Sequence, residues 1–338
     1  MDFTTGGRLE VRITPADVGK RVSVRLLTGA ADPHATFTDV VGVLTSWTHD
    51  VLCVTRRSGE AVRIARSSLV AGKVVPAAPA RRRGPAASAR ELDRVAARGW
   101  PAVESEALGD WLLRASGGFT RRANSVLATG DPGLPLDAAL DRVTAWYGER
   151  GRPAYLQLST GAEDTQELLA AELDARGWTR EVSAQVRIAG LAPVADQDAD
   201  ISAVTLSRHI DDAWLARYQR SAAPSPEVRA VLSGGPSVWF ATIGGAAGDK
   251  VPAAIGRLVV DGRWAGFAAV EVAPERRRQG LAGAVMTALA RKALEEGASA
   301  AYLQVETDNE GAHALYEGLG FTVHHTYHHW RAPHGDAH

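Results

Sequence analysis

The stretch APERRRQGLAGAVM, residues 273–286, places three consecutive arginines and two glycines directly before an apolar helical pattern. Gly280 and Gly283 lack a Cβ, so a ligand can approach the backbone closely there. The first N–H groups of a helix have no intrahelical partner, and the helix dipole favours an anion at that end. The stretch therefore predicts a phosphate-binding loop. The alternative is a basic turn ahead of a well-capped helix.

A second stretch, NEGAHALYEGLGF at residues 309–321, has the spacing of a short amphipathic helix. Asn309 is a candidate N-cap, and apolar residues recur at positions 312, 315 and 319. Tyr316 lies beside that apolar face, and Gly320 is suited to end the helix. Packing of the helix requires neither the Asn309 side chain nor the Tyr316 hydroxyl. The alternative for Tyr316 is a half-buried aromatic residue with its hydroxyl in water.

Together the two stretches resemble the GNAT superfamily of acetyl-CoA-dependent N-acetyltransferases, over about residues 200–331. The pyrophosphate loop of that superfamily reads [Q/R]-x-x-G-x-[G/A], and its late motif reads N-x-x-A-x-x-L-Y-x-x-L-G-F. Both occur here in the expected strand–helix–strand–helix order. The loop is matched by Arg277, Arg278, Gln279, Gly280, Leu281 and Ala282, and the late motif by Asn309, Ala312, Leu315, Tyr316, Leu319, Gly320 and Phe321.

The resemblance implies where acetyl-CoA, the expected co-substrate, would bind. The diphosphate would lie on the loop from Arg277 to Gly283, and the pantetheine arm would pair with backbone groups around Val270 and Val272. Asn309 would bind the cofactor arm or hold the loop. The late-motif residues Ala312 and Tyr316 would also line the cofactor site.

The resemblance also implies direct attack of an amine on the thioester, without a covalent enzyme intermediate. Tyr316 would be the general acid that protonates the leaving thiolate. Several members place a glutamate at the strand position that matches Gln304, which here can only orient water. Glu271 is the first choice of general base, and Glu306 is the other neighbouring carboxylate. An amine that arrives neutral through a water chain would need no base.

Further elements must position these residues, and the first of them lie in residues 7–76. Val-, Ile-, Leu- and Thr-rich runs at about 8–14, 21–27, 39–48, 50–57 and 61–75 predict five short strands of a small SH3-like or Sm-like β-barrel, with a hairpin turn at Ser58–Gly59. Such barrels bind peptides or nucleic acid, or only hold domains together. Residues 77–90, rich in Pro, Ala and Arg, predict a linker.

Residues 91–192 and 199–332 both read as alternating strands and helices. In each, a helix, a glycine and a strand containing AYLQ follow one another, so the chain looks like two copies of one α/β unit. Chance similarity of two such stretches is the alternative. The first copy has TGDPGLPLD in place of RRRQGLAG, so we expect a degenerate GNAT-like domain followed by one catalytic GNAT domain with a mixed central sheet. The fold class is α/β (α+β).

Composition limits the remaining possibilities. The chain has 338 residues, is 45% hydrophobic and carries a net charge of −1, so no overall field draws it to nucleic acid or membrane. Its one cysteine, Cys53, excludes an intrachain disulfide and fits a buried core thiol. The start has no signal-peptide pattern, and no apolar run reaches a membrane-spanning length. We expect a cytoplasmic protein.

The histidines near the end of the chain do not predict a metal site. On a strand, His324 and His328 share one side, and His325 and His329 share the other. No Asp, Glu or Cys completes a recognisable ligand set, so we expect a closing strand near the cleft and no metal.

Over nearly its whole length the layout resembles an actinobacterial two-part acetyltransferase family whose members are often labelled N-acetylglutamate synthases. The expected partners are therefore acetyl-CoA and a small-molecule or peptide amine, with glutamate as one acceptor. A homodimer is left open by the sequence. The alternative function is a non-catalytic adaptor that senses CoA or binds nucleic acid through the barrel and Arg81–Arg83.

Overall fold

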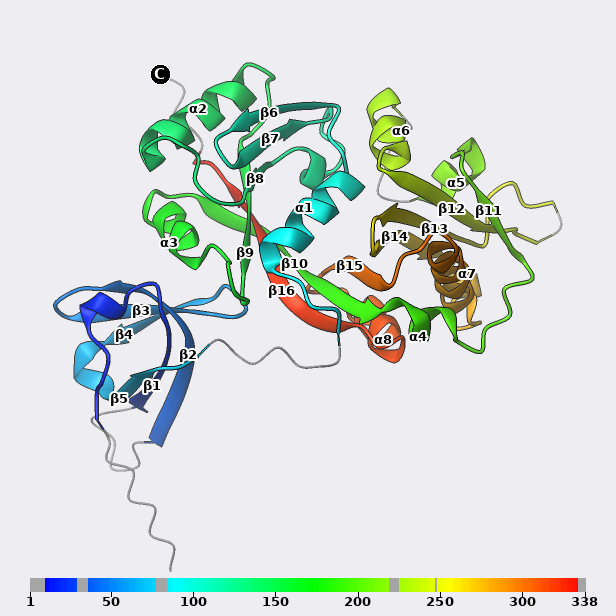
Figure 1. The fold of residues 1–338 in the computed structure, drawn as a ribbon. Coiled ribbons are helices and arrows are strands. Elements are labelled where there is room, and N and C mark those ends of the chain that lie inside the picture. Colours follow the sequence, from blue (N-terminus) through cyan, green and yellow to red (C-terminus); the bar gives the residue numbers. More distant parts are fainter. Residues whose placement is uncertain (1–9, 29–35, 77–83, 219–224, 247, 334–338) are drawn as a thin grey trace, which may run out of the picture.

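The computed structural model describes residues 10–28, 36–76, 84–218, 225–246 and 248–333. They form two β-sheets, one of five strands and one of eleven. In Figure 1 the small sheet lies apart at one end, and helices flank the large one. Most of the predicted linker, including Arg81–Arg83, lies outside the described residues.

The small sheet has the order β4-β3-β2-β1-β5, which confirms a small N-terminal β domain. Its core is a single cluster of eight buried aliphatic residues. The strands are β1 (Arg21–Thr28), β2 (Thr36–Trp47), β3 (Val51–Arg56), β4 (Ala61–Ala65) and β5 (Leu69–Val74).

Two of the five expected strands differ from the structure. The run at 8–14 is reduced to an isolated bridge between Val11 and Gly72, because a 3₁₀ turn with Pro15 in its first position follows at once. The run at 61–75 is two strands, β4 and β5, separated by a second 3₁₀ turn, Arg66–Ser68. There the Ser68 hydroxyl donates to the Ala65 carbonyl at 2.7 Å and fixes the turn.

The large sheet is mixed and has the order β11-β12-β13-β14-β15-β10-β16-β9-β8-β7-β6. We call α1 to β10 the first half and α4 to β16 the second half. The strands are β6 (Glu104–Leu108), β7 (Trp111–Ala115), β8 (Val126–Ala128), β9 (Tyr155–Thr160), β10 (Thr179–Gly190), β11 (Val204–Ser207), β12 (Ser237–Ile243), β13 (Ala254–Asp261), β14 (Trp264–Val272), β15 (Ala300–Glu306) and β16 (Thr322–Arg331).

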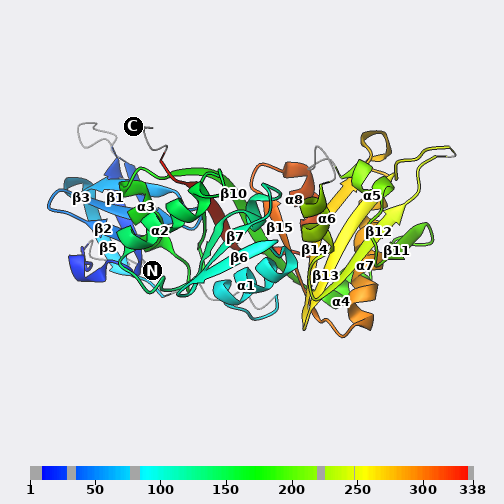
Figure 2. The same cartoon turned by 90° about the horizontal axis from the view of Figure 1, so that it is seen from above.

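Helices cover both faces of this sheet. One face of the second half packs against α4, α7 and α8, and we call it the α7 face; the opposite face packs against α1, α5 and α6, and we call it the α1 face (Figure 2). The helices are α1 (Ala89–Gly99), α2 (Leu136–Gly148), α3 (Glu167–Ala175), α4 (Leu191–Ala195), α5 (Asp212–Arg217), α6 (Pro226–Ser233), α7 (Leu281–Glu295) and α8 (Glu310–Gly318).

Helix α1 was not predicted, although its signal is in the sequence. Ser88 caps it by accepting the Glu91 N–H at 3.1 Å, and Leu92, Val95 and Ala96 are buried on one side. The helix start at Ala89 lies inside the predicted linker, residues 77–90, because the Pro- and Arg-rich run before it was extended over the first helical residues.

The two halves exchange their last strands. Strand β10 of the first half lies between β15 and β16, and β16 of the second half lies between β10 and β9. In register, Ala184 of β10 is opposite Glu306 on one side and Tyr327 on the other. Each half therefore completes its sheet with a strand that the other half supplies.

The barrel docks on the exchanged strand β16. Arg57, in the β3–β4 hairpin, donates to the carbonyls of Val323 and His324 at 3.1 and 2.9 Å. Gly59 has a φ of 78°, and a Cβ there would lie 2.4 Å from His328 Nε2. The turn predicted at Ser58–Gly59 thus needs its glycine for the dihedral angle and for the close approach.

The exchange makes a prediction about the isolated second half. A fragment of residues 199–338 lacks β10 and β9, so the edges of β15 and β16 would have no neighbour and a long hydrophobic edge would be exposed. We expect it to be insoluble or without a cooperative thermal transition. Co-expression with residues 1–198 should restore a folded complex. A well-folded fragment, seen by circular dichroism, would contradict the prediction.

Candidate active site

The parallel strands β14 and β15 separate halfway along their length. They pair from Trp264 opposite Ala300 to Phe267 opposite Leu303, and the pairing ends there. At the same level the β13–β14 register shifts, and Ala269 has a φ of 51°. This β-bulge turns β14 away from β15. We call the resulting gap between Ala268–Val272 and the end of β15 the opening.

The loop before α7 begins where β14 ends. Gly280, the N-cap of α7, has a φ of 80°, and Arg278 has a φ of 59°, so the chain reverses tightly there. No side chain caps the helix, so its first N–H groups remain available. A Cβ built on Gly280 or Gly283 would meet no atom within 4 Å. This is the geometry of a phosphate-binding helix start.

The side chains of this loop differ in exposure and in their contacts. Arg277 and Arg278 are exposed, whereas the Arg276 Nε donates to Gln279 Oε1 at 2.9 Å. Gln279 therefore offers a ligand mainly its backbone. Leu281 packs against the apolar core of the α7 face. Ala282, which follows it, belongs to the first turn of α7.

Helix α8 lies on the same side of the sheet. Tyr316 packs against the core of the α7 face, and its ring meets Phe321 edge-on with centroids 5.9 Å apart. Ala312 packs against the same core, as do Val270 and Val272 of β14. The fold therefore brings the two predicted motifs and the predicted cofactor strand to one face.

Asn309 is engaged in the helix itself. Its Oδ1 accepts the Ala312 N–H at 3.1 Å, as expected of an N-cap. Only its amide nitrogen remains for a cofactor.

Glu271 lies on the opposite face of the opening. It is opposite Ile255 in the β13–β14 ladder, and Ile255 belongs to the core of the α1 face. Gln304 and Glu306 of β15 alternate with residues of the α7 core, so they also face the α1 side. The Oε1 of Gln304 is buried without a hydrogen-bond partner among the described residues. Tyr316 and Glu271 are thus on opposite sides of the opening.

The first half supplies part of the wall on the α1 face. Phe119 packs against the same cluster as Ala268 and Ala269, and its ring lies 6.1 Å from that of Tyr218. Gly117 lies against α6, where a Cβ would be 3.1 Å from Cγ of Glu227. Sequence reasoning missed these residues because it treated the first half as a separate unit.

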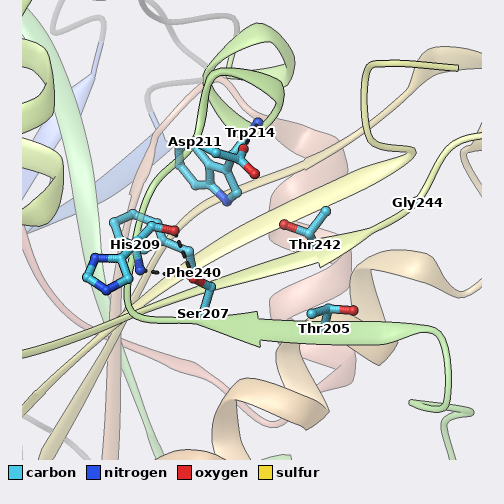
Figure 3. A pocket seen from close by; sticks show the side chains of 8 residues that line it. All are labelled: Thr205, Ser207, His209, Asp211, Trp214, Phe240, Thr242 and Gly244. Atoms are coloured by element: carbon cyan, nitrogen blue, oxygen red, sulfur yellow. Dashed lines mark hydrogen bonds between the residues drawn. The ribbon is translucent and has the colours of Figure 1, made fainter.

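A cavity of about 280 Å³ lies near the other end of the second half's sheet (Figure 3). Asp211 accepts the Trp214 N–H at 2.7 Å, and the Trp214 indole donates to the Ala241 carbonyl at 3.2 Å. These hydrogen bonds cap α5 and join it to β12, and the opening lies two strands away. The cavity is therefore separate from the opening. The cavity is lined by Thr205, Ser207, His209, Asp211, Trp214, Phe240, Thr242 and Gly244.

Two histidines of β16, His325 and His328, take part in buried hydrogen bonds. His325 Nε2 lies 3.1 Å from Asp93, and His328 lies 2.9 Å from the Thr160 hydroxyl and 2.7 Å from that of Ser183. Burial, with a smaller effect of Arg180, lowers the pKa of His328 to about 3. Among the described residues, no group of three or more His, Cys, Asp or Glu side chains could hold a metal ion. Within those residues, no helix combines the length and the apolar character that a membrane crossing requires.

Separated parallel strands, a glycine loop at a helix start and the Asn–Tyr helix define an N-acetyltransferase of the GNAT superfamily. The chain belongs to the Rv0428c family. Residues 86–330 match the family model described as "Probable histone acetyltransferase Rv0428c C-terminal", and residues 16–73 match "Rv0428c N-terminal Sm-like domain".

Two relatives and two solved structures support this assignment. The chain is 31% identical to the Mycobacterium tuberculosis protein "Probable histone acetyltransferase Rv0428c" over 91% of this chain and 93% of that protein. It is 27% identical to the Bacillus subtilis protein "Uncharacterized N-acetyltransferase YobR" over 69% of this chain and 94% of that protein.

A GCN5-related N-acetyltransferase from Kribbella flavida shares the fold at a TM-score of 0.53 and 20% identity, over 75% of this chain and 98% of that one. A tandem GNAT protein from the clavulanic acid biosynthesis pathway shares the fold at a TM-score of 0.52 and 16% identity, over 75% of this chain and 91% of that one. These likenesses confirm the GNAT fold. The relatives' names do not mention N-acetylglutamate, so that label stays a prediction.

The loop geometry predicts the effect of a charged side chain at Gly280. Gly280→Glu should weaken CoA binding about tenfold or more, because a carboxylate would occupy the place of the diphosphate and repel it. Gly297→Glu is the matched control: Gly297 follows the other end of α7, has a φ of 88° and has equal free space.

Both variants carry the same backbone strain, about 1 kcal/mol, so their thermal stabilities should fall alike. Calorimetric titration with CoA measures the difference. Equal affinity in the two variants would remove the loop from the cofactor site.

Proposed function

We propose that the chain transfers the acetyl group of acetyl-CoA to a primary amine within the opening between β14 and β15. The observation that carries this proposal is the arrangement around the opening. The anion-binding loop and Tyr316 are on the α7 face, and Glu271 is on the α1 face. A thioester that enters from one face would meet an amine that enters from the other.

On the α7 face, the diphosphate would bind the loop from Arg277 to Gly283. The arm would follow β14, whose backbone groups around Val270 and Val272 face the opening because the parallel pairing stops at Phe267. Backbone groups without a ladder partner need another one, and the amide groups of the arm can supply it. Asn309 would contribute its amide nitrogen from the start of α8.

The chemistry would need few groups. The amine nitrogen forms a bond to the thioester carbon, and a backbone N–H of β14 stabilises the negative charge on the oxygen. The carbon–sulfur bond then breaks, and Tyr316 donates its proton to the thiolate. Glu271 accepts a proton from the amine, directly or through water. Gln304, whose carbonyl oxygen has no partner among the described residues, would orient that water.

The acceptor class divides into two groups that one assay separates. The name of the mycobacterial relative points to a lysine side chain in a basic protein, and the layout described above points to an amino acid such as glutamate. The assay measures thiol release from acetyl-CoA with glutamate, a histone amino-terminal peptide and spermidine. Release above the rate of hydrolysis with one acceptor supports the proposal. No release with any amine would favour a CoA-binding adaptor.

Tyr316→Phe tests the general acid. The substitution keeps the ring packed against Phe321 and removes only the hydroxyl. We expect kcat to fall about 100-fold, while the KM for acetyl-CoA changes little. Steady-state kinetics with the best acceptor gives both values. An unaltered kcat would assign Tyr316 a packing role alone.

Glu271→Gln tests the general base. The amide keeps the size of the side chain but cannot take a proton. The rate of the wild-type enzyme should fall at low pH as the carboxylate is protonated, and the variant should be slow without that acidic limb. The measurement is kcat at saturating amine as a function of pH, because kcat/KM would also follow the protonation of the free amine. A variant that keeps the acidic limb would exclude Glu271 as the base.

A further inference from the structure

Arg122 places an unpaired positive charge on the α1 face, close to the opening. Its Nε donates to the Tyr327 hydroxyl at 2.7 Å, and its guanidinium lies over the rings of Trp100 and Tyr327, at 5.5 and 5.8 Å from their centroids. Within the described ranges no carboxylate pairs with it, and its two terminal nitrogens have no hydrogen-bond partner. An arginine in this state offers a planar two-donor edge.

His329 is a second unsatisfied group in the same place. Its side chain is 2% exposed, and neither ring nitrogen has a hydrogen-bond partner in the part of the chain that the structure describes. Its ring lies 5.6 Å from that of Tyr327. Burial, together with the charges of Arg122, Arg114 and Arg121, lowers its pKa well below the usual value, so the ring is neutral. A buried polar ring without partners indicates a missing ligand.

The surrounding charge is positive. Arg114 is buried and donates only to neutral groups, the carbonyl and hydroxyl of Ser125 and the amide oxygen of Gln157, at 2.9 to 3.0 Å. Burial lowers the pKa of Arg114 to about 10, which still leaves it charged at neutral pH.

Glu271 and Glu306 lie on the same face at the opening, and two other carboxylates near the cluster are engaged by other groups. Arg121 is paired with Glu181 at 2.7 Å. Asp93 is held by His325 and by the Ser159 hydroxyl. Two cations, Arg114 and Arg122, therefore remain without a paired carboxylate among the described residues, and a buried or half-buried charge without a counterion is costly.

The register places this cluster beside the opening. Tyr327 is opposite Ala184, which is opposite Glu306 at the end of β15, so Tyr327 and Glu306 lie two strands, roughly 10 Å, apart. Three residues before Arg122, Phe119 packs against the same buried cluster as Ala268 and Ala269 of the bulge. The cluster thus lies on the face from which the amine would enter, two strands from the end of β15.

We propose that Arg122 and His329 form a subsite for a carboxylate of the acceptor, so that the acceptor is a small amine that carries a carboxylate, as amino acids do. The terminal nitrogens of Arg122 would bind both carboxylate oxygens, and the His329 ring N–H would donate to one of them. This subsite rests on the proposed acetyl transfer. It adds that the first half, through Arg122, selects the substrate of the second half.

The test compares L-glutamate and glycine with their fully amidated counterparts, which lack the carboxylate charge. A lysine peptide with blocked termini and O-phosphoethanolamine represent acceptors with no carboxylate and with a phosphate. Arg122→Gln should raise the KM for the carboxylates about 10- to 100-fold and leave the KM for their amides and for acetyl-CoA unchanged. Each acceptor is compared with itself across variants, so differences in amine basicity cancel. Arg122→Lys should recover part of the loss.

Two further variants complete the design. His329→Phe fills the same space without ring nitrogens and should give a smaller rise, again for carboxylates alone. Arg142→Gln is the matched control, since Arg142 is exposed on α2 and pairs with Glu106. Thermal unfolding of every variant checks that the fold is kept.

The results separate the subsite from the reaction. A wild-type preference for the lysine peptide, the amides or O-phosphoethanolamine would overturn the carboxylate subsite and leave acetyl transfer standing. An equal effect of Arg122→Gln on acids and amides would do the same. No turnover of any amine would overturn both.

Discussion

The bulge at Ala269 is the constraint on which the site depends. Parallel strands that stayed paired would satisfy each other's backbone groups and close the sheet to any ligand. Because β14 turns away after Phe267, its last residues present N–H and C=O groups to the opening. The side chains of β14 change at this point from fully buried to partly exposed. The glycine loop and α8 matter because they border this gap.

The exchange of β10 and β16 ties the site to the rest of the chain. Strand β16 follows α8, which carries Tyr316, and then enters the sheet of the first half next to β9. Any shift between the halves therefore acts on both ends of α8. The same strand carries Tyr327 and His329 to the α1 face and binds the hairpin of the barrel through its backbone carbonyls. One strand thus connects the acid, the proposed acceptor subsite and the N-terminal domain.

The parts of the candidate site that could be predicted from the sequence are local. The loop at 277–283 and the helix at 309–321 are short contiguous stretches. Local backbone geometry fixes the positions of the glycine and of the N-cap in them, so residue spacing alone reveals both. The placement of Glu271 across the opening from Tyr316 was not predicted. It depends on the bulge at Ala269, and alanine is not a residue type that marks a bulge. Nothing local connects Arg122 with Tyr327, which are 205 residues apart. The two residues come into contact because the halves exchange strands, and the hydrophobic periodicity of the sequence does not reveal that exchange.

The first half has a different turn at the place where the second half has the loop before α7. Its equivalent turn before α2 carries Asp131, whose side chain accepts the Gly133 N–H at 2.7 Å, and Asp110 accepts the Asp131 N–H at 3.2 Å. Carboxylates of the chain itself therefore take two N–H groups of this turn, and their charge repels a diphosphate. The N-cap of α2 is Pro135, which has no N–H to offer. The first half instead contributes Phe119 and Gly117 to the wall of the α1 face and, in the proposed subsite, Arg122.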